Sequence, residues 1–266
     1  MRGDILLYWQ LPSKIMPLLF TTSWDDGHVL DVRIAEMLER YDLRGTFYVL
    51  PHEGGESLRN ETIRALAEKH EIGAHTLRHR NLPDLSAEEM ESEIRGSKEW
   101  VQHITGKSCT MFCYPRGFVS TAAKHAIAQA GFAGARTTVP LQFGTDDPYM
   151  LPTTLQVYPF PMRPRFSQWW HPLDPLGPLR AKWRRLRALG TPIAACKGWL
   201  PLAKWLLVYA VQTEQPFFHL WGHAKEIKRY GMWEQLEALL AFAKTQDIAP
   251  ATNAEFIAAL RPPSAL

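Results

Sequence analysis

The sequence predicts a single α/β domain whose parallel strands curl into a distorted barrel of the (β/α)7 type. Short apolar and β-branched runs alternate with amphipathic stretches along most of the 266 residues, which is typical of a parallel sheet with helices outside. About seven such units in one domain favour a barrel over an open sheet. Because the chemistry of such barrels lies at the carboxyl ends of the strands, the residues that follow each strand are the candidates for function.

Each predicted strand is a short run of apolar, aromatic or β-branched residues bounded by turn residues or charges. The first, residues 17–24, ends at two adjacent carboxylates, and the second, 45–50, is rich in aromatic and β-branched residues. Further strands are expected at 71–76, 109–115, 132–138, 151–159 and 216–223.

The predicted helices lie between these strands and carry apolar residues at helical spacing, as residues 29–41 do. Residues 85–106 form the longest one, and Ser86 with Glu89 three positions later gives it a capping-box start. The helix at 121–131 ends on a glycine. The other helices are expected at 57–70, 202–215 and 232–246.

The composition is that of an ordinary soluble globular protein, with 46% hydrophobic and 21% charged residues. A net charge of +3 predicts no general affinity for nucleic acid. Three cysteines do not make a disulfide framework and suit reduced thiols. The first twenty residues lack a convincing signal peptide, because their longest apolar run is five residues. We therefore expect a cytoplasmic protein that can act at the membrane face.

One segment breaks the alternation of strands and helices. Residues 160–200 are rich in Pro, Arg and Trp, and 163–187 hold seven basic residues against one acid. We expect an insertion in a barrel that spans 18–262, preceded by an N-terminal extension at 1–17. Its basic patch could contact an anionic lipid or a phosphate.

Two adjacent carboxylates, Asp25 and Asp26, directly follow the first predicted strand. Like charges side by side repel, so a positive group is expected nearby. His75 and His79 follow the third strand, and a helical turn there would place both imidazoles on one face. Two imidazoles and one carboxylate make a divalent-metal site with an open position for water. One aspartate would then bind the metal while the other stays free as a base.

These motifs resemble those of the polysaccharide deacetylases of the NodB-homology type, carbohydrate esterase family 4. The first family motif, T-F-D-D, reads S-W-D-D at 23–26, and the second, H-[ST]-x-x-H, is met in full at 75–79. The resemblance covers about residues 18–260 and implies a distorted (β/α) barrel of seven strands.

The resemblance also implies a role for each matching residue. By position, Asp26, His75 and His79 are the ligands of a divalent metal, which in this family is usually zinc. Asp25, the neighbouring acid, is the general base.

The third family motif, R-x-P-Y, is altered here, because C-Y-P-R places Cys113 at the arginine and Arg116 at the tyrosine. The family arginine tethers the catalytic aspartate, which a thiol cannot do, so either Arg116 takes over part of this role or another basic group reaches in. The backbone N–H at the tyrosine position helps to form the oxyanion hole, and Arg116 still supplies one. The last motif, L-x-L-x-H, ends in the general acid. His223 fits it because it follows its strand, whereas His219 lies inside the strand as a core residue.

The sequence thus predicts a metal-dependent hydrolase that removes an N-acyl group, expected to be acetyl, from an amino sugar or sugar conjugate. Asp25 would deprotonate water, His223 would protonate the departing amine, and Tyr114 and Trp221 are candidates for substrate contact. Two alternatives stay open. A related enzyme could hydrolyse another C–N bond in a small or cyclic amide, or the barrel could bind metal and glycan with little turnover.

Overall fold

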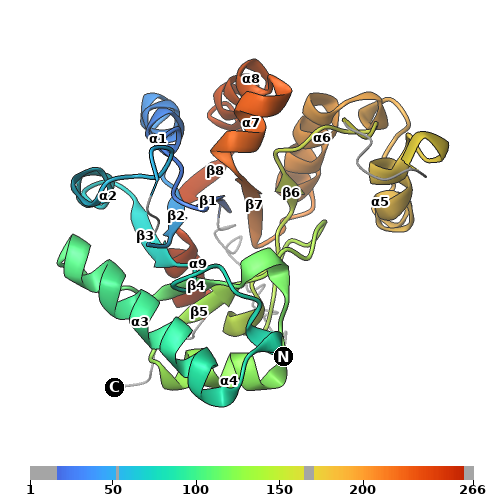
Figure 1. Cartoon of the computed structure of the whole chain (residues 1–266). Helices are drawn as coiled ribbons and strands as arrows, with labels where there is room; N and C mark the ends of the chain where they lie inside the picture. Colours follow the sequence, from blue (N-terminus) through green and yellow to red (C-terminus); the bar gives the residue numbers. More distant parts are fainter. Residues whose placement is uncertain (1–16, 52–53, 165–170, 261–266) are drawn as a thin grey trace, which may run out of the picture.

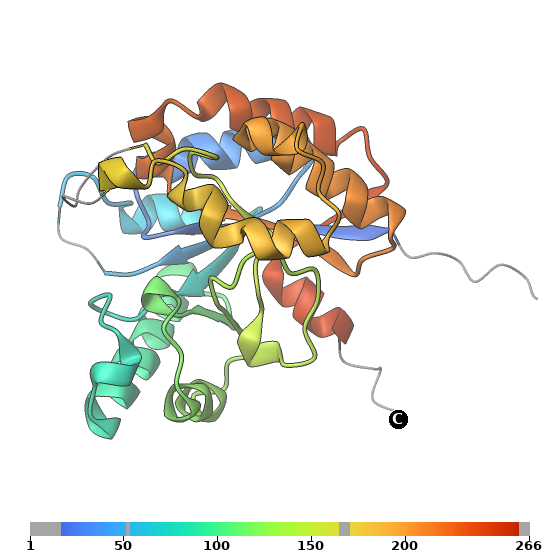
Figure 2. The same ribbon diagram turned by 90° about the vertical axis from the view of Figure 1, so that its right-hand side faces the viewer.

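The computed structural model describes residues 17–51, 54–164 and 171–260. Its strands form one parallel sheet in the order β5-β4-β3-β2-β1-β7-β6, with β8 paired to β1 beside this path. The strands are β1 (Leu18–Asp25), β2 (Thr46–Val49), β3 (Glu71–Ala74), β4 (Met111–Cys113), β5 (Gly134–Arg136), β6 (Leu155–Gln156), β7 (Phe217–Gly222) and β8 (Ile248–Ala251). Figures 1 and 2 show this sheet surrounded by helices.

Strand β1 is the centre of the sheet. It pairs with β7 from Leu19 to Trp24 along one edge. On its other edge it pairs first with β8 and then, from Ser23 to Asp25, with β2. Its side chains are nearly all buried, as expected for a parallel strand that is covered on both faces.

The segment around Leu151 brings the two ends of the sheet together. The Leu151 N–H donates to the Ala135 carbonyl at 2.9 Å, and Leu151 O accepts from the Thr137 N–H at 2.8 Å. A few residues later β6 pairs with β7. The sheet therefore curls into a distorted barrel, as the sequence predicts.

The helices are α1 (Asp31–Arg40), α2 (Asn60–Leu66), α3 (Ala87–Thr105), α4 (Thr121–Gln129), α5 (Gly177–Ala188), α6 (Trp199–Gln212), α7 (Ala224–Tyr230), α8 (Trp233–Ala243) and α9 (Asn253–Leu260). The predicted capping box of α3 is confirmed, because Ser86 and Glu89 each bond the other's backbone N–H. Helices α5, α7 and α9 and strand β8 are not among the predicted elements. Strand β8 contains Pro250, which a sheet tolerates at an edge.

The predicted insertion runs between β6 and α6 and contains α5, which lies at one side of the molecule in Figure 1. Arg185 of this helix donates to the Pro140 carbonyl at 2.6 Å, which ties α5 to the loop after β5. Residues 165–170 of the insertion lie outside the described residues, as do all but the last residue of the predicted extension at 1–17. None of the described helices is long and apolar enough to cross a bilayer.

Candidate active site

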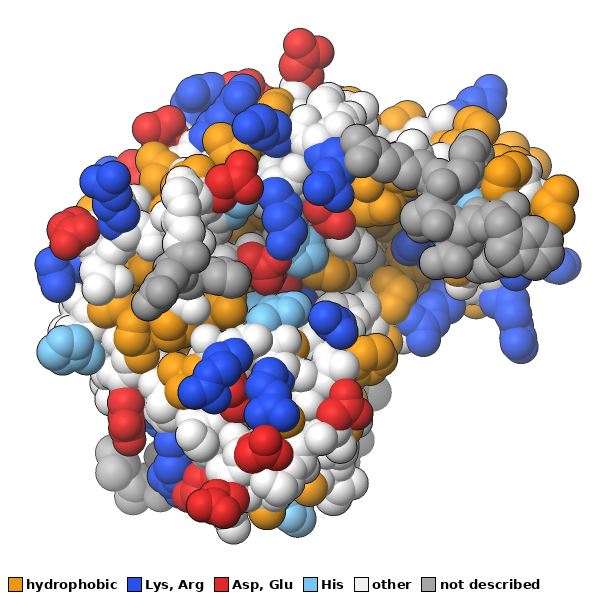
Figure 3. Space-filling view, viewed as in Figure 1, with side chains coloured by type: hydrophobic (Ala, Val, Ile, Leu, Met, Phe, Trp, Pro, Cys, Tyr) orange, Lys and Arg blue, Asp and Glu red, His pale blue; other side chains and the backbone are white. Residues whose placement is uncertain are grey.

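A cavity of about 340 Å³ opens at the carboxyl ends of the strands. Figure 3 shows histidine and acidic side chains together in a hollow near the centre of this face, with basic side chains around it. The cavity is lined by Asp25, His75, His79, Tyr114, Arg116, Thr138, Pro140, Gln156, Lys182, Trp221 and His223. Seven of these come from the sequence motifs, and the structure adds the other four.

The three predicted metal ligands meet beside this cavity. Asp26 Oδ1 lies 3.7 Å from His75 Nε2 and 3.6 Å from His79 Nε2. The ligand atoms of the three residues all lie within 4.8 Å of one another. This is the carboxylate and imidazole set that a divalent cation with an open position requires.

The loop that carries the two histidines is not a helical turn, contrary to the expectation from their spacing. Thr76 and His79 both have positive φ, 63° and 53°, so the chain twists tightly after β3. Glu93 of α3, 1% exposed, holds this twist, because its carboxylate accepts from the N–H groups of Leu77 at 2.8 Å and Arg78 at 2.9 Å. The two imidazoles still meet, with ring centroids 4.8 Å apart.

The protonation states suit metal binding. The His75 Nδ1–H donates to the Cys113 carbonyl at 2.8 Å, which leaves the Nε2 lone pair toward Asp26. Burial lowers the pKa of His75 to about 4, so the ring is neutral at pH 7. Burial alone would raise the pKa of Asp26, but the charges of His223 and Lys225 outweigh it and hold that pKa well below its ordinary value. Asp26 Oδ1 is buried without a hydrogen-bond partner, as expected for an atom that binds a cation.

Asp25 is held by Arg136, a residue that the motif analysis missed. Arg136 is fully buried at the end of β5, and its Nη2 donates to Asp25 Oδ1. The guanidinium carbon lies 5.3 Å from the ring centroid of Tyr48 and 4.7 Å from that of Trp221, so both rings pack on the cation. Cys113, at the position of the family arginine, is the register partner of Arg136 on β4. The basic group therefore reaches Asp25 from the next strand, and Arg116 does not take this role.

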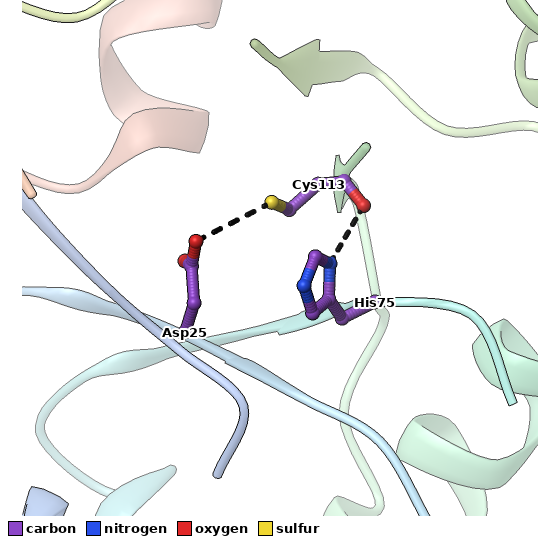
Figure 4. Close-up of side chains that lie close together, drawn as sticks. All are labelled: Asp25, His75 and Cys113. Carbon is purple, nitrogen blue, oxygen red and sulfur yellow. Dashed lines mark hydrogen bonds between the residues drawn. The ribbon is translucent and has the colours of Figure 1, made fainter. Parts of the chain in front are cut away.

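Asp25, His75 and Cys113 form a second cluster of possible ligand atoms within 4.8 Å (Figure 4). The Cys113 thiol lies 3.8 Å from Asp25 Oδ2. Burial raises the pKa of this thiol well above its ordinary value, and a thiol binds metal only as the thiolate. Asp25 is already paired with Arg136. The set around Asp26 is therefore the better metal site.

His219 lies within β7 and His223 directly follows it, and the two side chains have different surroundings. His223 precedes α7, its Nδ1 lies 2.9 Å from Glu226 Oε2, and its Nε2 lies 3.9 Å from Asp26 Oδ2. Burial opposes protonation, but the Glu226 hydrogen bond and the nearby aspartates outweigh it and raise the pKa of His223. His219 is fully buried and bonds the hydroxyls of Thr21 and Ser23. Burial depresses the pKa of His219, so it cannot act as an acid at neutral pH.

The predicted substrate residues lie on the cavity wall. Tyr114 is fully buried, donates its hydroxyl to the Tyr149 carbonyl at 3.1 Å and forms part of the cavity wall. Trp221 packs edge-on against His223, with ring centroids 5.6 Å apart. Arg116 has a positive φ of 55° and lines the cavity after β4.

The chain is similar to several known proteins. Residues 18–135 match the family described as polysaccharide deacetylase. The chain is 27% identical over 128 residues to a peptidoglycan-N-acetylglucosamine deacetylase of Bacillus cereus, a match that covers 47% of this chain and 57% of that protein. It is also 27% identical over 121 residues to the peptidoglycan-N-acetylmuramic acid deacetylase PdaA of Bacillus subtilis, covering 45% of this chain and 44% of that one. The chain thus spans about half the length of these relatives.

A solved structure shares the fold over most of the chain. The family 4 acetyl xylan esterase from Clostridium thermocellum, in complex with a cobalt ion, superposes with a TM-score of 0.55 at 15% identity and covers 91% of each chain. At that identity the likeness concerns the fold, which is the curled parallel barrel described above. Residues 18–135, which carry the two aspartates and the histidine pair, therefore match the polysaccharide deacetylase family, and the described chain shares the fold of the family 4 esterase.

Proposed function

We propose that this protein is a metal-dependent hydrolase that removes an N-acyl group, acetyl in the simplest case, from an amino sugar or glycan. One observation carries the proposal. A buried Asp26 oxygen without a hydrogen-bond partner faces two imidazoles, directly beside a second aspartate that has its own cation. The relatives named above act on N-acetylated sugars of peptidoglycan, which supports the same substrate class here.

Asp26, His75 and His79 would hold the metal, and two imidazoles with one carboxylate suit zinc. When bound, the cation would polarise the acyl carbonyl and lower the pKa of a water molecule. It would also offset the charge of Asp26, part of which Lys225 neutralises in the structure.

The other residues act on the proton and on the leaving group. Asp25 accepts the proton of the attacking water, and Arg136 fixes the carboxylate in place. The Arg116 N–H stabilises the oxyanion. His223, held by Glu226, donates a proton to the departing amine, for which its raised pKa is suited.

Metal content and acetate release together test this assignment. His75→Ala and His79→Ala should lower the metal content of the purified protein, whereas Asp25→Asn should keep the metal and lose turnover by orders of magnitude. A substrate panel should include N-acetylated sugars and small cyclic amides. Equal metal content in the wild type and in both histidine variants would rule out the site, and turnover of the cyclic amides alone would favour the other C–N hydrolase.

A glycan-binding barrel with little turnover is less well supported than an enzyme. That alternative rests on the missing motif arginine, and Arg136 now supplies the cation to Asp25. Contact of residues 163–187 with an anionic lipid or phosphate, like the cytoplasmic location, stays a prediction. Flotation with anionic liposomes, with and without this segment, tests the contact.

A further inference from the structure

Two basic side chains line the cavity without an acidic partner. Arg116 belongs to the loop after β4, and Lys182 comes from α5, more than sixty residues later in the sequence. Within the part of the chain that the structure describes, neither side chain makes a hydrogen bond or ion pair. Both remain available to a ligand.

The other cations near the site are neutralised by carboxylates. Arg136 pairs with Asp25, and Lys225 pairs with Asp26. Arg116 lines the same cavity as His75 and His79, two of the proposed metal ligands. The cavity therefore carries an excess of positive charge even before a metal binds, and such a field attracts anions.

Lys182 is also partly withdrawn from water. Burial lowers its pKa, and no carboxylate contributes to the shift. An ammonium group in this setting loses hydration without gaining a partner, which is unfavourable until an anion occupies the cavity. A partly buried ammonium group without a carboxylate partner on a cavity wall is typical of a binding site for an anionic group.

Resting on the proposed function, we propose that the N-acylated sugar carries an anionic group, a carboxylate or a phosphate, and that Arg116 and Lys182 bind this group inside the cavity. Helix α5 of the insertion then contributes a specificity residue rather than surface charge alone. The volume of about 340 Å³ is at the small end for ligand sites, so the anion belongs on or next to the sugar that is deacylated.

Binding to the metal-depleted full chain tests this without turnover. Calorimetry compares three probes: N-acetylglucosamine, N-acetylmuramic acid with its carboxylate, and a phosphate ester of N-acetylglucosamine. We expect at least one anionic sugar to bind about tenfold or more tightly than the neutral one, and the two anionic probes distinguish carboxylate from phosphate. Lys182→Gln should remove most of this preference, and Lys182→Arg should restore it.

Arg184→Gln is the matched control, because it removes the same charge from an exposed position of α5. Equal affinity for the neutral and anionic sugars, no measurable binding of either anionic sugar, or equal effects of Lys182→Gln and Arg184→Gln would overturn the inference. Failure of the proposed function would look different, because the metal-loaded protein would then release no acyl group from any of the sugars while the preference in binding persisted.

Discussion

Replacing Arg136 by methionine should destabilise the protein strongly, because it leaves the buried Asp25 carboxylate without its cationic partner. The substitution keeps most of the side-chain volume but removes the guanidinium that bonds Asp25. Asp25 is only 3% exposed, and among the described residues its other side-chain hydrogen bond is with the weakly donating Cys113 thiol at 3.8 Å. The aspartate would therefore stay buried without an adequate partner.

The expected magnitude follows from this burial. Breaking a buried ion pair by removing one partner costs about 3–5 kcal/mol, because the other charge is left uncompensated. For a chain of this size each kcal/mol lowers the melting temperature by about 2–4 °C, so we expect a fall of about 6–20 °C. Asp25→Asn should also destabilise the protein, since it leaves the buried Arg136 guanidinium without a carboxylate partner. The double variant, Asp25→Asn with Arg136→Met, should lose far less free energy of unfolding than the two single losses added together, which corresponds to a coupling energy of about 2 kcal/mol or more.

Urea denaturation of the wild type, the two single variants and the double variant measures this coupling. A further variant, Cys113→Arg with Arg136→Cys, moves the guanidinium to the register partner on β4, which faces the same side of the sheet. It should recover stability and acetate release relative to Arg136→Met. If Arg136→Met were as stable as the wild type, or if the single losses simply added, the proposed role of the ion pair would be wrong.

Three further predictions concern acid catalysis, pH dependence and backbone strain. His223→Gln should lower the rate of acyl release about 10²–10⁴-fold while metal content measured by atomic absorption stays unchanged; loss of the metal as well would contradict its role as an acid. Burial raises the pKa of Glu71 from 4.5 to about 7. Between these pH values the folded protein therefore binds more protons than the unfolded chain. The free energy of unfolding should fall by at most about 3 kcal/mol as the pH rises through that range. Urea titrations at several pH values should show this dependence of the free energy of unfolding on pH, and Glu71→Gln should weaken it. An unchanged dependence in the variant would mean that other groups cause it. Gly117 has a φ of 75°, and an added Cβ would lie 2.0 Å from Thr138 Oγ1. Gly106 has a similar φ of 66°, but an added Cβ there would meet nothing within 4 Å. Gly117→Ala should therefore lower the free energy of unfolding more than Gly106→Ala does. Equal losses of unfolding free energy in the two alanine variants would mean that the contact is relieved elsewhere.

Local sequence determined much of the fold and the identity of the metal-site candidates. Strand and helix periodicity placed β1 to β7 and most helices within a few residues, because burial on both faces of a parallel strand and on one face of a helix leaves a pattern that needs no long-range information. The elements it missed are short or polar, such as β8 with its proline and the arginine-rich α5. The two aspartates and the histidine pair were visible because each lies within a few residues of its partner.

The partners of these residues were decided by tertiary structure. Asp25 finds its cation 111 positions away on β5, and the only sequence signal was an arginine in the middle of a predicted strand. Glu93 shapes the histidine loop from α3, and Lys182 reaches the cavity from an insertion. Such contacts depend on how the barrel curls and on which strands become neighbours. Local periodicity carries no information about this, so the residues that position and charge the site emerge only once the chain is folded.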